Sequence, residues 1–199
     1  MAVNLSESKT LTNLMRAFAG ECQAHARYYY AAEAAKHQKL PCIQQAFQYT
    51  ADQEYEHAGV FLKQLRTAGL KNVDISAGYP VDIETDTLAL LRSAQHGEAE
   101  ERHIIYPDFA RIAREEGFEH IAFLFDAIAK IEETHSNRFA ELANLLESGQ
   151  LFSTGGQQVR WVCLNCGHVI EGPDAPQQCP VCAHEQGYFV RQDYAPFTH

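Results

Sequence analysis

Two copies of the motif Glu-x-x-His constrain this 199-residue chain most, Glu54-x-x-His57 and Glu132-x-x-His135. Both lie in segments whose apolar residues recur with the period of an amphipathic α-helix. Residues three positions apart share a helix face about one turn from each other, so each Glu and its His can bind the same metal centre. Carboxylate oxygens are hard ligands that can bridge two cations, and imidazole suits iron and other transition metals. The motif therefore predicts a metal site between helices.

Four helical segments are predicted, and each has an apolar face interrupted near its middle by carboxylates or imidazoles. The faces are Leu11, Leu14, Phe18, Glu21, His25, Tyr28, Ala32 and Ala35; Phe47, Thr50, Glu54, His57, Phe61 and Leu65; Leu91, Ala94, Glu98, Glu101, Ile105, Asp108 and Ile112; and Ile121, Phe125, Ile128, Glu132, His135, Phe139, Leu142 and Leu146. One inward Glu alone is more typical of a solvated helix edge. Four interruptions at the same depth indicate one polar site inside a bundle.

The ends of these segments carry ordinary helix signals. Pro41 and Asp86 predict the starts of the second and third helices, and Gly69, Gly117 and Gly149 follow the second, third and fourth. Residues 70–85 are too long for a tight turn and fit a crossover between two helix hairpins. We therefore expect a mainly α fold, a ferritin-like four-helix bundle with one long connection.

The hairpins read as an internal duplication. Glu21 precedes Glu54 by 33 residues and Glu98 precedes Glu132 by 34, which places a Glu on the first helix of each hairpin and Glu-x-x-His on the second. This is the known ligand pattern of di-iron carboxylate bundles. The halves differ at Glu101, which has no counterpart in the first hairpin.

Buried carboxylates without a cation would each cost several kcal/mol, so two metal ions are expected at this site. Glu101 gives one of the metals a choice between itself and His57. The candidate ligands are Glu21, Glu54, His57, Glu98, Glu101, Glu132 and His135.

Several neighbours of the ligands have more than one interpretation. His25 is interpreted as a core histidine, with metal contact as the lesser alternative, and the hydroxyls of Tyr28 and Tyr106 either reach ligand carboxylates or simply pack. Pro107 predicts a kink or bulge in the third helix because it lacks an N–H. The remaining glutamates of the bundle are expected on solvated faces: Glu33, Glu56, Glu100, Glu115, Glu116, Glu119 and Glu133.

The C-terminal part of the sequence lacks the helical pattern and contains paired cysteines. Two Cys-x-x-Cys pairs, Cys163/Cys166 and Cys179/Cys182, predict a tetrahedral four-thiolate site that suits iron or zinc. Short strands with aromatic residues should cover the metal, which must help so small a unit to fold. We expect a bundle domain over 1–149, a linker over 150–158 and a metal-binding β domain over 159–199.

Composition limits the function classes. The formal net charge is -10, which argues against nucleic acid as a partner because phosphates attract clustered Lys and Arg. No run of about 18 apolar residues predicts a membrane span, and the N-terminal residues lack the build of a signal peptide, so a cytoplasmic location is expected. Cys22 and Cys42 stand apart from the pairs and read as ordinary thiols.

The motifs together resemble rubrerythrin over nearly the whole chain. The motifs that carry the resemblance are Glu21, Glu54-x-x-His57, Glu98-x-x-Glu101, Glu132-x-x-His135 and Cys163-x2-Cys166-x12-Cys179-x2-Cys182, with "YPDFARIAREEGF" from Tyr106. The resemblance implies a di-iron bundle fused to a rubredoxin-like domain, with two irons in the bundle and one on the four cysteines. Two departures from the family pattern are Ala183, where glycine is usual, and Cys22, where a small hydroxyl residue is more common.

The resemblance also implies residue roles. Glu54 and Glu132 would bridge the irons, Glu21 would be terminal on one iron, and Glu98 and His135 would be terminal on the other. On reduction the first iron would exchange Glu101 for His57. Tyr28 matches a family tyrosine near the cluster.

The implied function is a cytoplasmic peroxidase that reduces hydrogen peroxide to water in oxidative-stress defence. Electrons would come from an external NAD(P)H-dependent rubredoxin reductase, and the protein would form a head-to-tail homodimer. Two rival functions remain at this point: a ferritin-type iron oxidase or store, and a non-enzymatic electron carrier or zinc-bearing structural module. The first leaves the thiolate domain without a role, and the second leaves the helical ligands without one.

Overall fold

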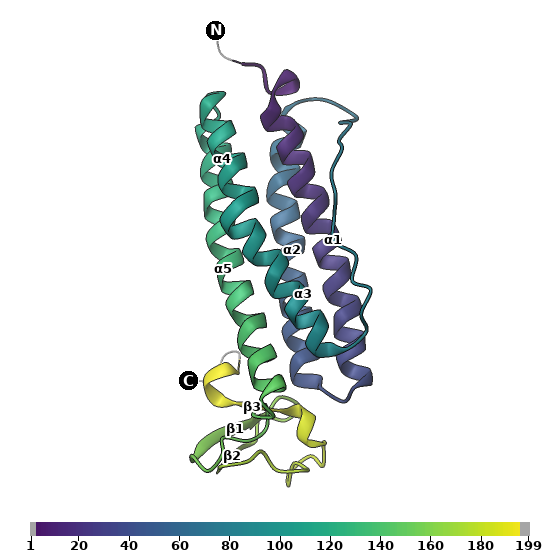
Figure 1. Ribbon diagram of the computed structural model, residues 1–199, viewed down its shortest axis with the longest axis vertical. Helices are drawn as coiled ribbons and strands as arrows, with labels where there is room; N and C mark the ends of the chain where they lie inside the picture. Colours follow the sequence, from purple (N-terminus) through teal and green to yellow (C-terminus); the bar gives the residue numbers. More distant parts are fainter. Residues whose placement is uncertain (1–2, 196–199) are drawn as a thin grey trace.

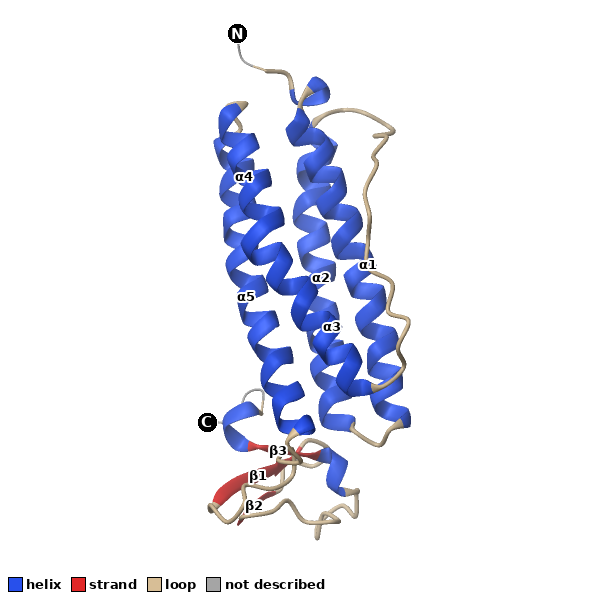
Figure 2. Cartoon of the chain, viewed as in Figure 1, coloured by secondary structure: helices blue, strands red, loops and turns tan. Residues whose placement is uncertain are grey.

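Four long helical rods run along a common axis, and a small β domain covers one end of them (Figures 1 and 2). This computed structural model describes residues 3–195. Residues 1–2 of the predicted bundle domain and residues 196–199 of the predicted β domain lie outside the described residues. The rods are α1 (Lys9–His37), α2 (Pro41–Thr67), α3 (Thr87–Glu100) continued by the π-helical turn η2 (Glu101–Ile105) into α4 (Tyr106–Glu115), and α5 (Glu119–Glu147). The predicted mainly α, ferritin-like fold is confirmed.

The helices end where the sequence indicates. The Asp86 side chain accepts hydrogen bonds from the first N–H groups of α3, and Pro41 begins α2, where its missing N–H costs nothing. Gly69, Gly117 and Gly149 have φ of +69°, +86° and +70°, the left-handed conformation that glycine adopts without strain after a helix.

The π-helical turn explains one wrong prediction. Pro107 has no N–H for the carbonyl four residues earlier, and the N–H of Tyr106 donates instead to the carbonyl of Glu101, five residues back. The extra residue rotates the following turns, so Tyr106 and Ala110 are buried. Asp108, predicted on the inner face, is exposed and pairs with Arg111 at 2.6 Å.

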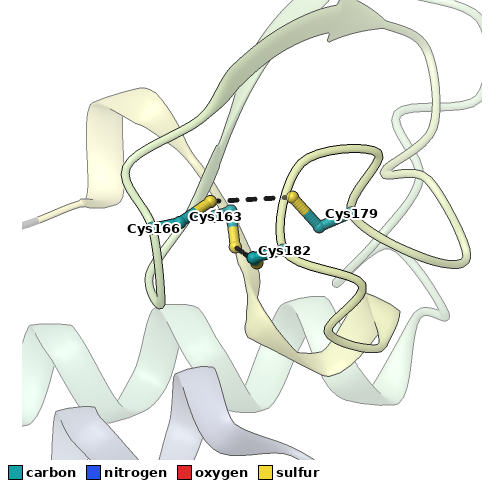
Figure 3. A group of neighbouring side chains, drawn as sticks. All are labelled: Cys163, Cys166, Cys179 and Cys182. Carbon is teal, nitrogen blue, oxygen red and sulfur yellow. Dashed lines mark hydrogen bonds between the residues drawn. The ribbon is translucent and has the colours of Figure 1, made fainter.

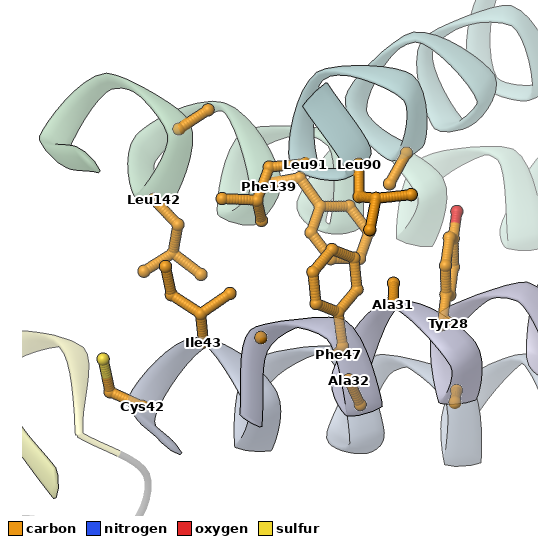
Figure 4. Close-up of a cluster of buried hydrophobic side chains, with 14 of the residues drawn as sticks. Tyr28, Ala31, Ala32, Cys42, Ile43, Phe47, Leu90, Leu91, Phe139 and Leu142 are labelled. Atoms are coloured by element: carbon orange, nitrogen blue, oxygen red, sulfur yellow. The ribbon is translucent and has the colours of Figure 1, made fainter. Parts of the chain in front are cut away.

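Two apolar clusters fill the bundle, one on each side of the candidate ligands. In the cluster nearer the β domain, the side chains of Phe47, Leu91 and Phe139 converge from three helices (Figure 4). The second cluster contains Phe61 and Phe125. An apolar layer therefore packs on each side of the polar middle of the helices, and these two layers hold the helices together without help from the polar residues.

The crossover between the hairpins, called the strap here (residues 70–86), lies along α1 in Figure 1 without regular secondary structure. Side chains fix it at several points. Asp82 accepts hydrogen bonds from Arg27 at 2.7 and 3.1 Å and from Ser93 at 2.6 Å. The Tyr79 hydroxyl donates to the carbonyl of Arg16 at 2.9 Å.

Glu116, predicted on a solvated face, is half-buried and has a structural role that the sequence did not indicate. Its carboxylate accepts hydrogen bonds from the N–H groups of Lys9 and Thr10 at 2.9 and 2.8 Å and from the Thr10 hydroxyl at 2.6 Å. It thereby satisfies free donors at the start of α1 and ties the two hairpins together.

The C-terminal domain is a three-stranded antiparallel sheet in the order β2-β1-β3. Its strands are β1 (Val159–Cys163), β2 (Val169–Gly172) and β3 (Phe189–Arg191), with the short helical turns η3 (Gln186–Tyr188) and η4 (Gln192–Tyr194) beside β3. Trp161 and Phe189 are fully buried in its core. Within the predicted linker, Leu151 is buried and Ser153 forms a β-bridge with Asp174.

The β domain contacts the end of the bundle closely. Val190 packs into the neighbouring apolar cluster of the bundle, and the Tyr194 hydroxyl donates to Glu141 at 2.6 Å. Gly187 lies so near the α1–α2 turn that an added Cβ would be 2.3 Å from the carbonyl oxygen of Lys39. Only glycine permits this approach. Among residues 3–195, no helix combines the length and the apolar character of a membrane span.

Candidate metal centres

The bundle brings six of the seven candidate ligands together in two overlapping groups. Within each group the ligand atoms lie within 4.8 Å of one another. The groups are Glu21, Glu54, His57 and Glu132, and Glu54, Glu98, Glu132 and His135. Glu54 and Glu132 belong to both, which places them between two candidate metal positions. These six residues, all buried, are called the bundle site.

Both imidazoles present Nδ1 to the carboxylates. His57 Nδ1 lies 3.0 Å from Glu54 Oε2 and 3.1 Å from Glu132 Oε1. His135 Nδ1 lies 2.8 Å from an oxygen of each of the same two glutamates. On its far side, His135 Nε2 lies 3.1 Å from Gln53 Oε1, a partner that fixes the Nε2–H tautomer and leaves the Nδ1 lone pair for a metal.

Two tyrosines reach the ligand carboxylates from opposite helices. The Tyr28 hydroxyl on α1 donates to Glu98 Oε1 on α3, and the Tyr106 hydroxyl on α4 donates to Glu21 Oε1 on α1. Of the two interpretations open for these residues, the hydroxyl contact is therefore the correct one. Each bond fixes one oxygen of a carboxylate and leaves the other facing the centre of the bundle.

Burial and crowding distort the protonation of this cluster. Burial, reinforced by the charge of Glu54, raises the pKa of Glu98 to about 8, and burial also raises the pKa of Glu21. Burial acts in the same direction on Glu54, but hydrogen bonds to His135 and His57 prevail and lower its pKa to about 2. Burial opposes the charged form of His135, yet its carboxylate partners raise its pKa to about 11. Protons thus offset part of the negative charge that divalent cations would neutralise.

The unsatisfied atoms of the cluster fit a pair of metal ions. Buried polar atoms normally have hydrogen-bond partners. Apart from the histidine–carboxylate contacts within the cluster itself, an oxygen of Glu21, of Glu54 and of Glu98, both oxygens of Glu132, and Nδ1 of His135 have none. All of them face the same space, and oxygen and imidazole donors are the set that a di-iron centre uses.

Glu101, the seventh candidate, lies in neither group of ligand atoms among the described residues. It opens the π-helical turn η2, is half-buried, and lines a cavity beside α1. Burial, followed by the charge of Glu21, raises its pKa well above the ordinary value. The structure therefore shows His57 in the ligand cluster and Glu101 outside it.

His25, interpreted from the sequence as a core histidine, is half-buried and belongs to neither group of ligand atoms. Its Nδ1 lies 2.8 Å from the carbonyl oxygen of Ala51 and its ring contacts Tyr29 and Tyr55. The role of Gln53 was missed, because an amide next to Glu54 carries no motif. Arg138 was missed as well; its guanidinium donates to Gln53 at 3.2 Å and holds it against His135.

In the β domain the four cysteines converge, as Figure 3 shows. The Sγ atoms of Cys163 and Cys182, and those of Cys166 and Cys179, are 3.7 Å apart. A tetrahedral metal bound at about 2.3 Å requires sulfur atoms roughly 3.8 Å apart, whereas a disulfide requires about 2.05 Å. These four residues, called the tail site, therefore fit one tetrahedral metal ion.

The two knuckles of the tail site have the same backbone design. Gly167 and Ala183 each donate their N–H to the carbonyl of the first cysteine of their pair, at 2.8 and 2.9 Å. Both have positive φ, +75° and +60°, so Ala183 adopts the conformation of the usual glycine despite its Cβ. The backbone N–H of His184 lowers the pKa of the Cys182 thiol to about 6, which favours the metal-binding thiolate.

Known proteins share both centres. The sequence model of the rubrerythrin family matches residues 12–143, and that of the rubrerythrin rubredoxin-like domain matches residues 161–190. The chain is 45% identical to rubrerythrin of Clostridium perfringens over 187 residues, which are 94% of this chain and 95% of that protein. The chain belongs to the rubrerythrin family. Rubrerythrin of Nitratidesulfovibrio vulgaris is 44% identical over 186 residues, 94% of this chain and 95% of that protein.

Solved structures agree with this membership. Nigerythrin in its mixed-valence state superposes with a TM-score of 0.61 at 27% identity, over 96% of this chain and 94% of that one. A Desulfovibrio desulfuricans bacterioferritin superposes with a TM-score of 0.64 at 19% identity over 71% of this chain and 82% of that one, which shows the ferritin-like fold. Rubrerythrins are generally oxidoreductases. Iron is accordingly the cofactor of both centres: a di-iron site with carboxylate and histidine ligands, and a rubredoxin-like site with four cysteines.

Proposed function

We propose that this protein is a cytoplasmic peroxidase that reduces hydrogen peroxide to water in oxidative-stress defence. Its electrons come from NAD(P)H through an external rubredoxin reductase and the tail site. The observation that carries the proposal is the presence of both sites in one chain, each with ligands that fit iron. An iron store has no use for the tail site, and a simple electron carrier has no use for the bundle site.

In this proposal each buried ligand has its own role. Glu54 and Glu132, which belong to both ligand groups, would hold both metals; Glu21 would hold one, and Glu98 and His135 would hold the other. The bound irons supply the two electrons that, with two protons, convert one H2O2 into two H2O. Tyr28 holds its proton at Glu98 Oε1 and thereby keeps that carboxylate oriented.

Glu101 and His57 are proposed to exchange as ligands of one metal between oxidation states. Support comes from the position of His57 inside the ligand cluster and of Glu101 outside it, on a π-helical turn that interrupts the regular helix. Glu101→Ala should retain iron but lower peroxide turnover by about 10- to 100-fold, the usual cost of disturbing a metal's immediate surroundings. Unchanged turnover would favour a static site.

Electron transfer is proposed to occur between the subunits of a head-to-tail homodimer. From His135 to the end of α5 near Gly149 the helix rises roughly 20 Å, and the tail domain lies beyond that end (Figure 1). A chain with Glu54→Ala and Glu132→Ala should regain activity when it forms dimers with a chain carrying Cys163→Ser and Cys179→Ser. Verified mixed dimers without activity would refute transfer between subunits.

The main test compares metal forms of the full-length protein. Native protein should contain about three irons per chain and should consume peroxide with NAD(P)H and a rubredoxin reductase. Protein with zinc in the tail site and iron in the bundle should lose this coupled activity, because zinc has no redox chemistry. Full coupled activity with zinc in the tail would overturn the electron route, and iron oxidation without peroxide consumption would favour the ferritin-type function.

A further inference from the structure

A cavity of about 480 Å³ connects the surface beside α1 with the surroundings of the bundle site. Tyr28, Glu101 and Tyr106 line it. The two tyrosines are the residues whose hydroxyls donate to ligand carboxylates. A molecule in this cavity is therefore separated from the ligands by one layer of side chains.

Gly20 lines this cavity, one residue before the ligand Glu21. An ideal Cβ at Gly20 would be 3.6 Å from Cε1 of Tyr79 and 3.8 Å from Oε1 of Glu101. Both are ordinary van der Waals distances, so a methyl group at this position would touch both the Tyr79 ring and the Glu101 carboxylate. Larger side chains at this position would fill the passage between the Tyr79 ring and the Glu101 carboxylate.

The backbone gives no reason for a glycine at this position. Gly20 lies inside α1 and is absent from the glycines with positive φ, and glycine within a helix is less stable than alanine. The space beside Gly20 therefore distinguishes it from glycines such as Gly59 on α2, around which no atom lies within 4 Å of an added Cβ.

The opposite wall of the passage is fixed by the strap. The Tyr79 hydroxyl donates to the carbonyl of Arg16, and the Arg16 side chain donates in turn to the carbonyl of Ser76 at 3.2 Å. Three residues further on, Asp82 is bound by Arg27. The ring of Tyr79 is thus held at a defined distance from α1, and Arg16 and Arg27, the basic residues of the cavity lining, are engaged by the strap.

We propose that Gly20 and Tyr79 form the opening through which peroxide reaches the bundle site, and that its width selects H2O2 over bulky organic hydroperoxides. The inference rests on the proposed peroxidase function for its substrate class. H2O2 has two heavy atoms and no charge, so it fits where a methyl group would touch both walls. A hydroperoxide with a branched or aromatic carbon on its oxygen does not.

The first experiment narrows the opening and measures binding without turnover. Gly20→Leu in the reduced, iron-loaded, full-length protein, the state in which Glu101 is proposed to lie off the metal, should slow the association of azide with the di-iron site by about tenfold, as a restricted approach lowers an on-rate. Gly59→Leu, a matched change on a helix surface with free space, should leave the rate unchanged. Iron content and the final extent of azide binding are measured alongside, so that slower access is separated from a damaged site.

The second experiment widens the opening. Tyr79→Ala should raise kcat/KM for cumene hydroperoxide relative to that for H2O2 by about tenfold, the size of effect expected when a gating group is removed. The variant leaves every ligand and both tyrosines of the site in place. It should also speed azide association, and it decides the question if Gly20→Leu fails to hold iron.

The outcomes separate the two proposals. Azide association that stays within twofold of the wild-type rate in both variants overturns the opening at Gly20 and Tyr79. An unchanged preference between the two hydroperoxides in Tyr79→Ala overturns the selection by width. If the wild-type protein binds azide through this opening but consumes no peroxide, the peroxidase function fails while the opening stands.

Discussion

The bundle site lies between two apolar clusters, whereas the tail site is itself part of a much smaller core. The bundle site interrupts a core that four long helices build from both sides. The core of the tail consists of five buried residues, two of which, Cys163 and Cys179, are themselves ligands. The bundle therefore supplies the energy needed to bury charged ligands, while in the tail the metal itself supplies much of the folding energy.

Loss of the tail metal should have the largest effect, and it should affect the folding of the β domain but not that of the bundle. Cys163→Ser with Cys179→Ser should unfold the β domain and abolish NAD(P)H-linked peroxide consumption, because a core of this size does not hold the loops without the metal. The helical circular dichroism signal and the iron of the bundle should remain. Cys22→Ser, at an exposed thiol, serves as the control; a β domain that stays folded without metal would contradict the comparison.

A single hydroxyl should have a smaller effect on the bundle. Tyr106→Phe removes the donor to Glu21 Oε1 and keeps the ring in the apolar cluster. We expect the affinity for one of the two bundle irons to fall by about 10- to 100-fold, with iron in the tail unchanged. Iron titration followed by absorbance measures this. Tyr55→Phe on the exposed face of α2 is the matched control, and equal affinities in both variants would show that the Tyr106 hydroxyl does not support the site.

The stability of the metal-free bundle should depend on pH because of its own buried ligands. The pKa of Glu98 is raised from 4.5 to about 8, so the folded state keeps a proton that the unfolded state releases, and stability falls as pH rises through this range. The pKa of His135 is raised from 6.5 to about 11, so its contribution is complete below pH 6.5 and is lost above it. The pKa of Glu54 is lowered from 4.5 to about 2, so Glu54 stabilises the folded state more as pH rises through that range. This change is complete below pH 5.

Between pH 5 and 9, Glu98 and His135 therefore both lower the stability of the metal-free bundle as pH rises. The pKa values of Glu21, Glu101 and His57 are raised too, so these groups act in the same direction. The melting temperature of chelator-treated protein, followed by helical circular dichroism, should fall by roughly 5 °C over this range. Iron-loaded protein should fall less, because metal replaces the protons. A melting temperature that rises with pH in the metal-free protein would contradict the protonation pattern of the buried ligands.

What the sequence predicted well depends on local spacing. The two cysteine pairs and the Glu-x-x-His motifs lie within single turns or knuckles, so a short stretch of chain carries the full geometric information. Helix starts and ends at Asp86, Gly69 and Gly117 were predictable for the same reason. The internal duplication then placed the half-sites at the same depth in the bundle.

What the sequence did not predict depends on contacts between distant segments. Pro107 indicated a bulge, but not that the extra residue of the π-helical turn would move Asp108 to the surface. The binding of Glu116 to the start of α1 joins residues more than 100 positions apart, and the contact of Gly187 with the α1–α2 turn joins the two domains. A motif cannot encode such pairs, because each partner alone looks like an ordinary surface residue.

The central claim is that electrons from the tail site reduce peroxide at the bundle site. The most direct measurement mixes fully reduced, iron-loaded protein with enough H2O2 to accept all the electrons of both centres, in a stopped-flow spectrometer without oxygen and without reductase. The account predicts that the absorbance of the oxidised four-cysteine iron appears as peroxide disappears, with two electrons lost from the protein for each H2O2. Peroxide consumption while the tail iron stays reduced, or reduced protein that leaves peroxide intact, would contradict the account.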